Sequence, residues 1–149
     1  MRPLSRGTIE ARVVQSGRGA GDQPRFLSDP TDCRAIVGGL RFLRRLFAAP
    51  AIARYLGAEF LPGPDMRSDD ELLDYARRNG STVYHTSGTC KMGSDPMAVV
   101  DDRLRVQGLE GLRVVDASVM PAVTSTNTNS AVIMIAEKAS DMIRADARG

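Results

Sequence analysis

The C-terminal third of the chain carries the pattern that most constrains its fold: a short apolar run, a polar loop and a long amphipathic stretch. Residues 112–115 are apolar except at Arg113, which is typical of a buried strand, and Asp116 follows directly. After the loop, residues from about Ser130 to Ala145 place apolar side chains at helical spacing. The predicted buried stripe consists of Val132, Ile135, Ala136, Ala139, Met142 and Ile143. This pattern predicts a strand–loop–helix unit.

Two further helices are predicted upstream. One runs from Pro30 to about Ala48. Its apolar stripe consists of Ile36, Leu40, Leu43 and Phe47. Its opposite face, interpreted as solvated, carries Arg34, Arg41 and Arg45. The other begins after Ser68, where acidic residues suit the positive end of the helix dipole, and ends near Asn79 and Gly80.

Three strands complete the expected fold. Residues 8–14 are rich in β-branched side chains, and 99–106 and 112–115 are the second and third predicted strands. Between the first strand and Pro24 lies a glycine-rich stretch, 17–21, that lacks the third glycine and the following helix of a dinucleotide-binding turn, so we interpret it as a surface hairpin loop. The fold class expected is α+β: an antiparallel sheet with helices, plus the strand–loop–helix tail.

Composition excludes several classes of function. Hydrophobic residues make up 42% and charged residues 26%, and the formal net charge is +2, which gives no reason to expect nucleic acid or an anionic membrane as partner. Signal-peptide and membrane-spanning patterns are missing, so we expect a soluble, cytoplasmic protein. The cysteines, Cys33 and Cys90, and a single histidine do not make a metal site. A disulfide and two free thiols both stay open, the thiols being the simpler expectation.

Two places could carry chemistry. Histidine is the side-chain type that most readily exchanges protons near neutral pH, and His85 is the only one. Taken alone, such a histidine is more often a structural or surface residue. Asp116 follows an apolar run and precedes a loop and a helix, and ligands of α/β sheets bind at such strand ends. An ordinary strand–loop–helix unit explains that pattern as well.

The motifs around these residues resemble those of a known family. Residues 84–93 read Tyr-His-x-x-Gly-Thr-x-x-Met-Gly, and 111–121 read Gly-Leu-Arg-Val-Val-Asp-Ala-Ser-x-Met-Pro. Asn-Thr-Asn follows at 127–129, and Ile-Ala-Glu-Lys-Ala at 135–139. In this order they resemble the C-terminal portion of glucose–methanol–choline (GMC) oxidoreductases, in the choline dehydrogenase-like branch.

This resemblance implies FAD as cofactor and a primary alcohol as substrate. By resemblance, His85 removes the alcohol O–H proton while hydride leaves for flavin N5, and Asn127 holds the substrate oxygen. Asp116 and Ala117 match positions that line FAD. Backbone N–H groups at Thr128 and Asn129 would face the flavin ring.

The resemblance also implies an organisation in parts. Residues 1–107 match the substrate-binding, or cap, part of the family, and 108–149 match the last segment of its FAD-binding domain. The N-terminal Rossmann part is missing, so a complete site would need a further FAD-binding domain or chain. A fragment, a split-gene product and a truncated reading frame all fit. The rival hypothesis is a catalytically silent module that associates with other chains, itself included, through its tail.

Overall fold

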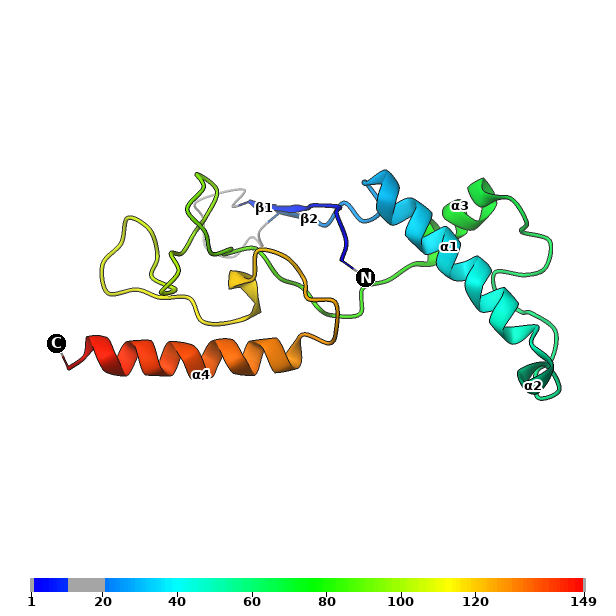
Figure 1. Cartoon of the computed structure of the whole chain (residues 1–149). Coiled ribbons are helices and arrows are strands. Elements are labelled where there is room, and N and C mark those ends of the chain that lie inside the picture. Colours follow the sequence, from blue (N-terminus) through cyan, green and yellow to red (C-terminus); the bar gives the residue numbers. More distant parts are fainter. Residues whose placement is uncertain (1, 11–20, 149) are drawn as a thin grey trace. The chain divides into compact units, whose positions relative to one another are not determined.

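The computed structural model describes residues 2–10 and 21–148 and has an α+β fold, as predicted (Figure 1). Its elements are β1 (Thr8–Glu10), β2 (Gly21–Gln23), α1 (Pro30–Phe47), α2 (Pro50–Ala53), α3 (Asp69–Asn79), a 3-10 turn (Ala117–Val119) and α4 (Asn129–Asp146). The chain forms two compact units. One comprises residues 4–81, and the other comprises residues 82–149 with 1–3.

The first unit contains a two-stranded antiparallel sheet. β1 pairs with β2 so that Thr8 lies opposite Gln23 and Glu10 lies opposite Gly21. The strand predicted at 8–14 is thus confirmed for its first three residues. Its remainder, and the glycine-rich stretch apart from Gly21, lie outside the described residues. β2 falls where a loop was predicted, because backbone pairing with β1 outweighs the poor strand propensity of glycine and aspartate.

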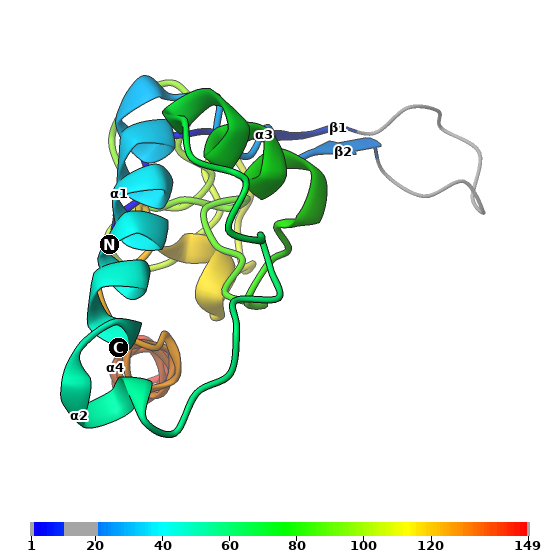
Figure 2. The same cartoon turned by 90° about the vertical axis from the view of Figure 1, so that its right-hand side faces the viewer.

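α1 and α3 confirm the two upstream helix predictions. The carboxylate of Asp29 caps α1 by accepting the Thr31 N–H at 2.7 Å. At the start of α3, Ser68 and Glu71 form a reciprocal capping box. α3 packs against α1 (Figure 2).

The buried face of α1 differs from the predicted stripe. Val37 is the buried residue of this helix, whereas Leu43 is 43% and Phe47 is 49% exposed. Ile36 and Leu40 are half-buried, so only the first half of the predicted stripe lies on the packed side of the helix. The opposite face is not simply solvated either, because Arg41 forms an ion pair with Asp69.

In the second unit, α4 packs against the loops that precede it. The core consists of Val100, Leu104, Val119, Met120, Ile135 and Ala139. The predicted C-terminal helix is confirmed with bounds Asn129–Asp146. Of its predicted stripe, Ala136 and Ile143 are exposed. Among the described residues, no helix combines the length and the apolar character needed to cross a membrane.

The strands predicted at 99–106 and 112–115 are wrong. The structure forms only isolated bridges there, one of them between Val100 and Val106. Residues 99–106 turn back on themselves, with Leu104 at a φ of +63°. This turn buries Val100 and Leu104. The apolar residues of 99–106 therefore belong to the core of the unit and do not form a sheet strand. Within the described part of the chain, residues 112–115 pair through the isolated bridge between Arg105 and Arg113, which is too short a ladder for a continuous strand.

Candidate active site

His85 lies in an extended loop segment of the second unit, directly after a strained residue. Tyr84 has a φ of +61°, which is uncommon for a residue that carries a Cβ atom. Its backbone N–H donates to Oγ1 of Thr82 at 3.0 Å, which closes the local turn. The side chain of Tyr84 is 86% exposed, whereas His85 is half-buried. Strained backbone tends to persist at functional sites, so this outlier marks the segment as a candidate.

Both ring nitrogens of His85 contact the segment that leads into α4. Nδ1 lies 2.9 Å from Oγ1 of Thr128, and Nε2 lies 3.3 Å from Nδ2 of Asn127. Thr128 is 7% exposed and is the buried polar residue of the described chain. These contacts join positions more than forty residues apart in sequence, and they hold the imidazole at both edges.

The start of α4 orients the amide of Asn127. Oδ1 of Asn127 accepts the backbone N–H of Asn129 at 2.9 Å. Because a backbone N–H can only donate, this bond identifies the amide oxygen and turns Nδ2 toward His85. Thr128 stands at the N-cap position but makes no capping bond with its side chain. The side chain of Asn127 accepts a backbone N–H of the first turn instead.

Asp116 and Ala117 belong to a neighbouring turn. Oδ1 of Asp116 accepts the Ser118 N–H at 2.7 Å and caps the 3-10 turn. The Ser118 hydroxyl lies beside this carboxylate, outside hydrogen-bond geometry, and together with the Ser118 N–H it holds the pKa of Asp116 below its usual range. Backbone bonds from Cys90 to Ser118 and from Met92 to Val119 fasten this turn to the chain that follows His85.

A hollow of about 310 Å³ opens beside His85. It is lined by Pro3, Thr82, Val83, His85, Val123, Thr124, Ser125 and Thr126. None of these side chains is a carboxylate or a basic group other than the imidazole. A neutral, partly hydroxylated lining suits the hydroxyl end of a small polar molecule.

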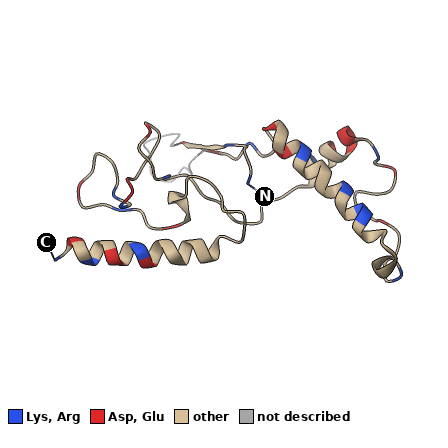
Figure 3. Cartoon of the chain, in the orientation of Figure 1, with Lys and Arg blue, Asp and Glu red and all other residues tan. Residues whose placement is uncertain are grey.

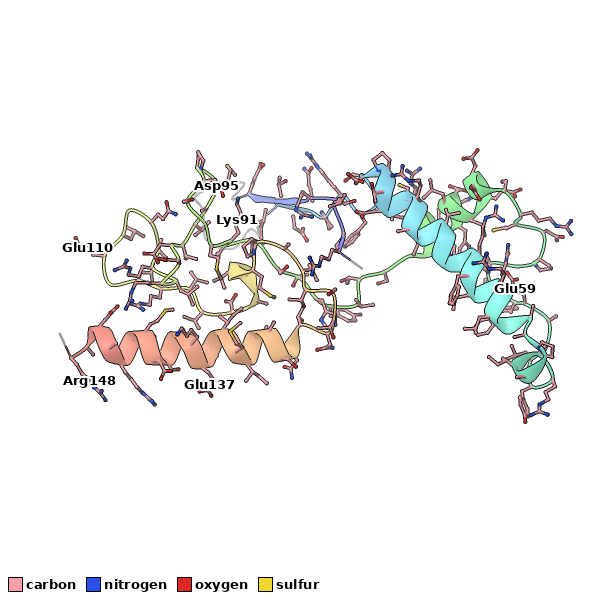
Figure 4. The ribbon with its side chains drawn as sticks, in the orientation of Figure 1. Glu59, Lys91, Asp95, Glu110, Glu137 and Arg148 are labelled. Carbon is pink, nitrogen blue, oxygen red and sulfur yellow. The ribbon has the colours of Figure 1, made fainter. Side chains whose placement is uncertain are left out.

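The first turns of α4 are also free of charge. Charged side chains on this helix begin at Glu137, and the part nearest the site is uncharged (Figure 3). Glu137 itself points away from the loops of its unit (Figure 4). The positive end of the helix dipole is therefore not neutralised by an acidic residue in the first turn.

A larger hollow, of about 660 Å³, lies elsewhere in the same unit. Arg105, Glu110 and Ile143 are among its lining residues, and none of the predicted site residues reaches it. Its size does not make it the better candidate, because it contains no group suited to proton transfer near neutral pH.

The structure thus brings His85, Asn127, Thr128 and Asn129 together in one cluster. Asp116 and Ala117 make no hydrogen bond to that cluster among the described residues. Sequence reasoning placed Thr128 near a cofactor through its backbone and missed the contact of its side chain with His85. No sequence signal marks that contact, because the burial of Thr128 is a property of the folded chain. Nothing in the sequence marks the backbone strain at Tyr84.

Comparison with known proteins places the chain in a family. A family model described as GMC oxidoreductase, for the C-terminal domain, matches residues 3–136. Because that match covers most of the chain, the protein belongs to the GMC oxidoreductase family. The resemblance seen in the motifs is confirmed.

Individual relatives agree. The chain is 46% identical over 148 residues to an oxygen-dependent choline dehydrogenase of Burkholderia vietnamiensis, covering 97% of this chain and 25% of that protein. An alcohol dehydrogenase [acceptor] of Pseudomonas putida is 43% identical over 141 residues, covering 95% of this chain and 26% of that protein. The structure of an FAD-dependent oxidoreductase from Chaetomium thermophilum matches with a TM-score of 0.89 and 32% identity, over 99% of this chain and 26% of that one. The chain therefore spans about a quarter of the length of these relatives.

Proposed function

We propose that this chain is the C-terminal catalytic part of an FAD-dependent, choline dehydrogenase-like enzyme that oxidises a primary alcohol. The observation that carries the proposal is the pairing of His85 with Asn127 at 3.3 Å beside a neutral hollow. The names of the relatives, a choline dehydrogenase and an alcohol dehydrogenase, support an alcohol as substrate.

In the proposed mechanism, the substrate hydroxyl inserts between the two side chains. Its oxygen accepts a hydrogen bond from Nδ2 of Asn127, and its O–H donates to Nε2 of His85. The proton moves to Nε2 as hydride leaves the carbinol carbon, so the alcohol loses a proton from oxygen and a hydride from carbon and becomes an aldehyde. The protonated Nε2 and the amide Nδ2 then both donate to the product oxygen, which stabilises the negative charge that develops there.

FAD, when bound, would supply the acceptor for that hydride. The residues at the start of α4 fit such a group. Among the described residues, the backbone N–H groups of Ser130 and Ala131 have no hydrogen-bond partner, as expected for a first helical turn. The N–H of Asn129 is already used by Asn127. These free donors, with the unopposed helix dipole, would stabilise negative charge on the flavin ring.

The division of labour within the chain is part of the proposal. Residues 1–107 would contribute to the substrate-binding side, and 108–149 would complete the FAD-binding domain. The compact units divide at 81/82 instead, so His85 and Asn127 share one unit although they come from different proposed parts. The rest of the FAD site would come from a Rossmann-type segment outside these 149 residues. The cytoplasmic location predicted from the sequence stays a prediction.

A second candidate is a silent module that only associates with other chains. The exposed apolar side chains of α4, Ile133 at 55% and Met134 at 59%, favour an association surface. Both candidate functions use that surface for association. They differ in whether the chain takes part in alcohol oxidation.

A chimaera separates them. This chain replaces the aligned quarter of the Burkholderia vietnamiensis relative, so that the remainder supplies the missing FAD-binding portion. If the chain is catalytic, the purified chimaera is yellow, and its flavin absorbance bleaches when choline or a simple primary alcohol is added without oxygen. A yellow chimaera that no alcohol in the series bleaches, while the parent protein is bleached, favours the silent module.

A further inference from the structure

The hydrogen bonds around His85 determine which of its nitrogens carries the proton. Oδ1 of Asn127 is occupied by the N–H of Asn129, so Nδ2 of Asn127 is the atom that faces Nε2 of His85. An amide nitrogen only donates. Nε2 must therefore accept, and in the neutral ring the proton must lie on Nδ1.

Oγ1 of Thr128 accepts a hydrogen bond from that Nδ1–H. With Nδ1 protonated, the 2.9 Å contact is an Nδ1–H donating to Oγ1 of Thr128. The opposite tautomer would place an Nε2–H against the amide N–H groups of Asn127. Relieving that clash by rotating the amide would break the bond to Asn129. Three contacts thus agree on one protonation pattern.

The position of Thr128 in the helix strengthens the inference. Threonine at an N-cap normally accepts a backbone N–H of the first turn. Here the side chain makes no such bond, although it is nine-tenths buried at the cap position. Its hydroxyl is instead committed to a ring forty-three residues away in sequence. The loss of a local capping bond is explained if the hydroxyl serves the histidine.

We propose that Thr128 is a positioning residue that holds His85 in the Nδ1–H tautomer, with the lone pair of Nε2 directed to the place where the substrate hydroxyl enters. Its catalytic consequence rests on the proposed function, whereas the tautomer itself does not. Thr128 touches neither substrate nor the reacting atoms. It acts through His85.

The single histidine makes the direct test simple. The 149-residue chain, labelled with nitrogen-15 at its one imidazole, gives one pair of ring nitrogen signals, whose shifts distinguish a protonated from an unprotonated nitrogen. At alkaline pH, wild type and Thr128→Ser should show Nδ1 protonated. Thr128→Val keeps the shape but removes the acceptor of the Nδ1–H, so the ratio of Nδ1–H to Nε2–H should fall about tenfold. A wild-type ring protonated mainly at Nε2 would overturn the proposal, whatever the variants do.

The chimaera supplies the second arm. Thr128→Val should lower kcat for alcohol oxidation about tenfold with little change in KM, and Thr128→Ser should restore it to within a few-fold of wild type. Equal losses in both variants would show a packing role and contradict positioning by the hydroxyl. Failure of the proposed function is distinguishable, because alcohol would then not bleach the wild-type chimaera, or His85→Ala would leave it active, while the wild-type isolated chain would still show Nδ1 protonated.

Discussion

Asn127 presents its amide nitrogen to Nε2 of His85 at 3.3 Å, and its amide oxygen is fixed at the same time by the backbone of α4. The orientation of the amide therefore depends on the helix and not on the histidine. This arrangement separates the two side chains into a proton acceptor and a fixed donor, and it makes their roles testable one at a time.

Replacing Asn127 by alanine removes the fixed donor. In the chimaera we expect flavin reduction by alcohol to slow by about ten- to a hundredfold, because the developing charge on the substrate oxygen loses one hydrogen bond. The pH dependence of the rate should keep its shape, since His85 still accepts the proton. Stopped-flow absorbance over a range of pH measures both. Loss of the low-pH limb in Asn127→Ala would show that Asn127 does more than orient the substrate.

Asp32 gives a prediction about acid stability. Its carboxylate accepts the Ser5 hydroxyl at 2.5 Å, the Leu4 N–H at 3.0 Å and the Ser5 N–H at 2.7 Å. These bonds, that of the Ser5 hydroxyl first, lower the pKa of Asp32 in the folded chain. A group with a lowered folded pKa contributes stability above its unfolded pKa, and this contribution is lost as pH falls through the folded pKa.

Urea unfolding at neutral and acid pH checks that prediction. Asp32→Asn should be less stable than wild type at pH 7, and the difference should shrink as the pH is lowered below the ordinary range of an aspartate. Ser5→Ala, which removes one of the donors, should show a smaller effect of the same sign. A difference between wild type and Asp32→Asn that is the same at both pH values would contradict the assignment.

The isolated chain should bind FAD weakly or not at all and should self-associate. It contains only one side of the proposed cofactor site, and Leu112, Ile133 and Met134 are about half or more exposed. Flavin fluorescence titration and light scattering on one sample test both statements. Ile133→Glu should reduce scattering, whereas Glu137→Gln, on the same helix, should not. Stoichiometric FAD binding by a stable monomer would show that the chain is self-sufficient.

Local signals explain what the sequence predicted well. α1, α3 and α4 have helical periodicity, and α1 and α3 also have side-chain caps at Asp29 and Ser68, so their bounds follow from residues close together in the chain. The strand predicted at 99–106 is wrong because β-branched residues favour burial as much as they favour an extended backbone. The turn in this segment depends on Leu104 adopting a positive φ. Leucine rarely does so, and no sequence pattern predicts it.

The candidate site also has a part that the sequence predicts and a part that only the fold reveals. His85 and Asn127 were found because they stand in motifs that resemble a family, and their contact agrees with that prediction without testing their roles. The use of the Thr128 hydroxyl could not be predicted, because it depends on a loop and a helix start coming together across forty-three residues. Periodicity and capping rules describe neighbours in sequence. They give threonine at this position a capping role that the fold assigns to Asn127.

His85→Ala in the chimaera tests the central claim most directly. Under anaerobic single-turnover conditions, the rate of flavin bleaching by alcohol, divided by alcohol concentration in the linear range, measures proton and hydride removal together. Loss of the general base should lower this rate about 10²–10⁴-fold, while the bound flavin absorbance stays that of the parent chimaera. Bleaching within a few-fold of the parent rate, with flavin fully bound, would contradict the account.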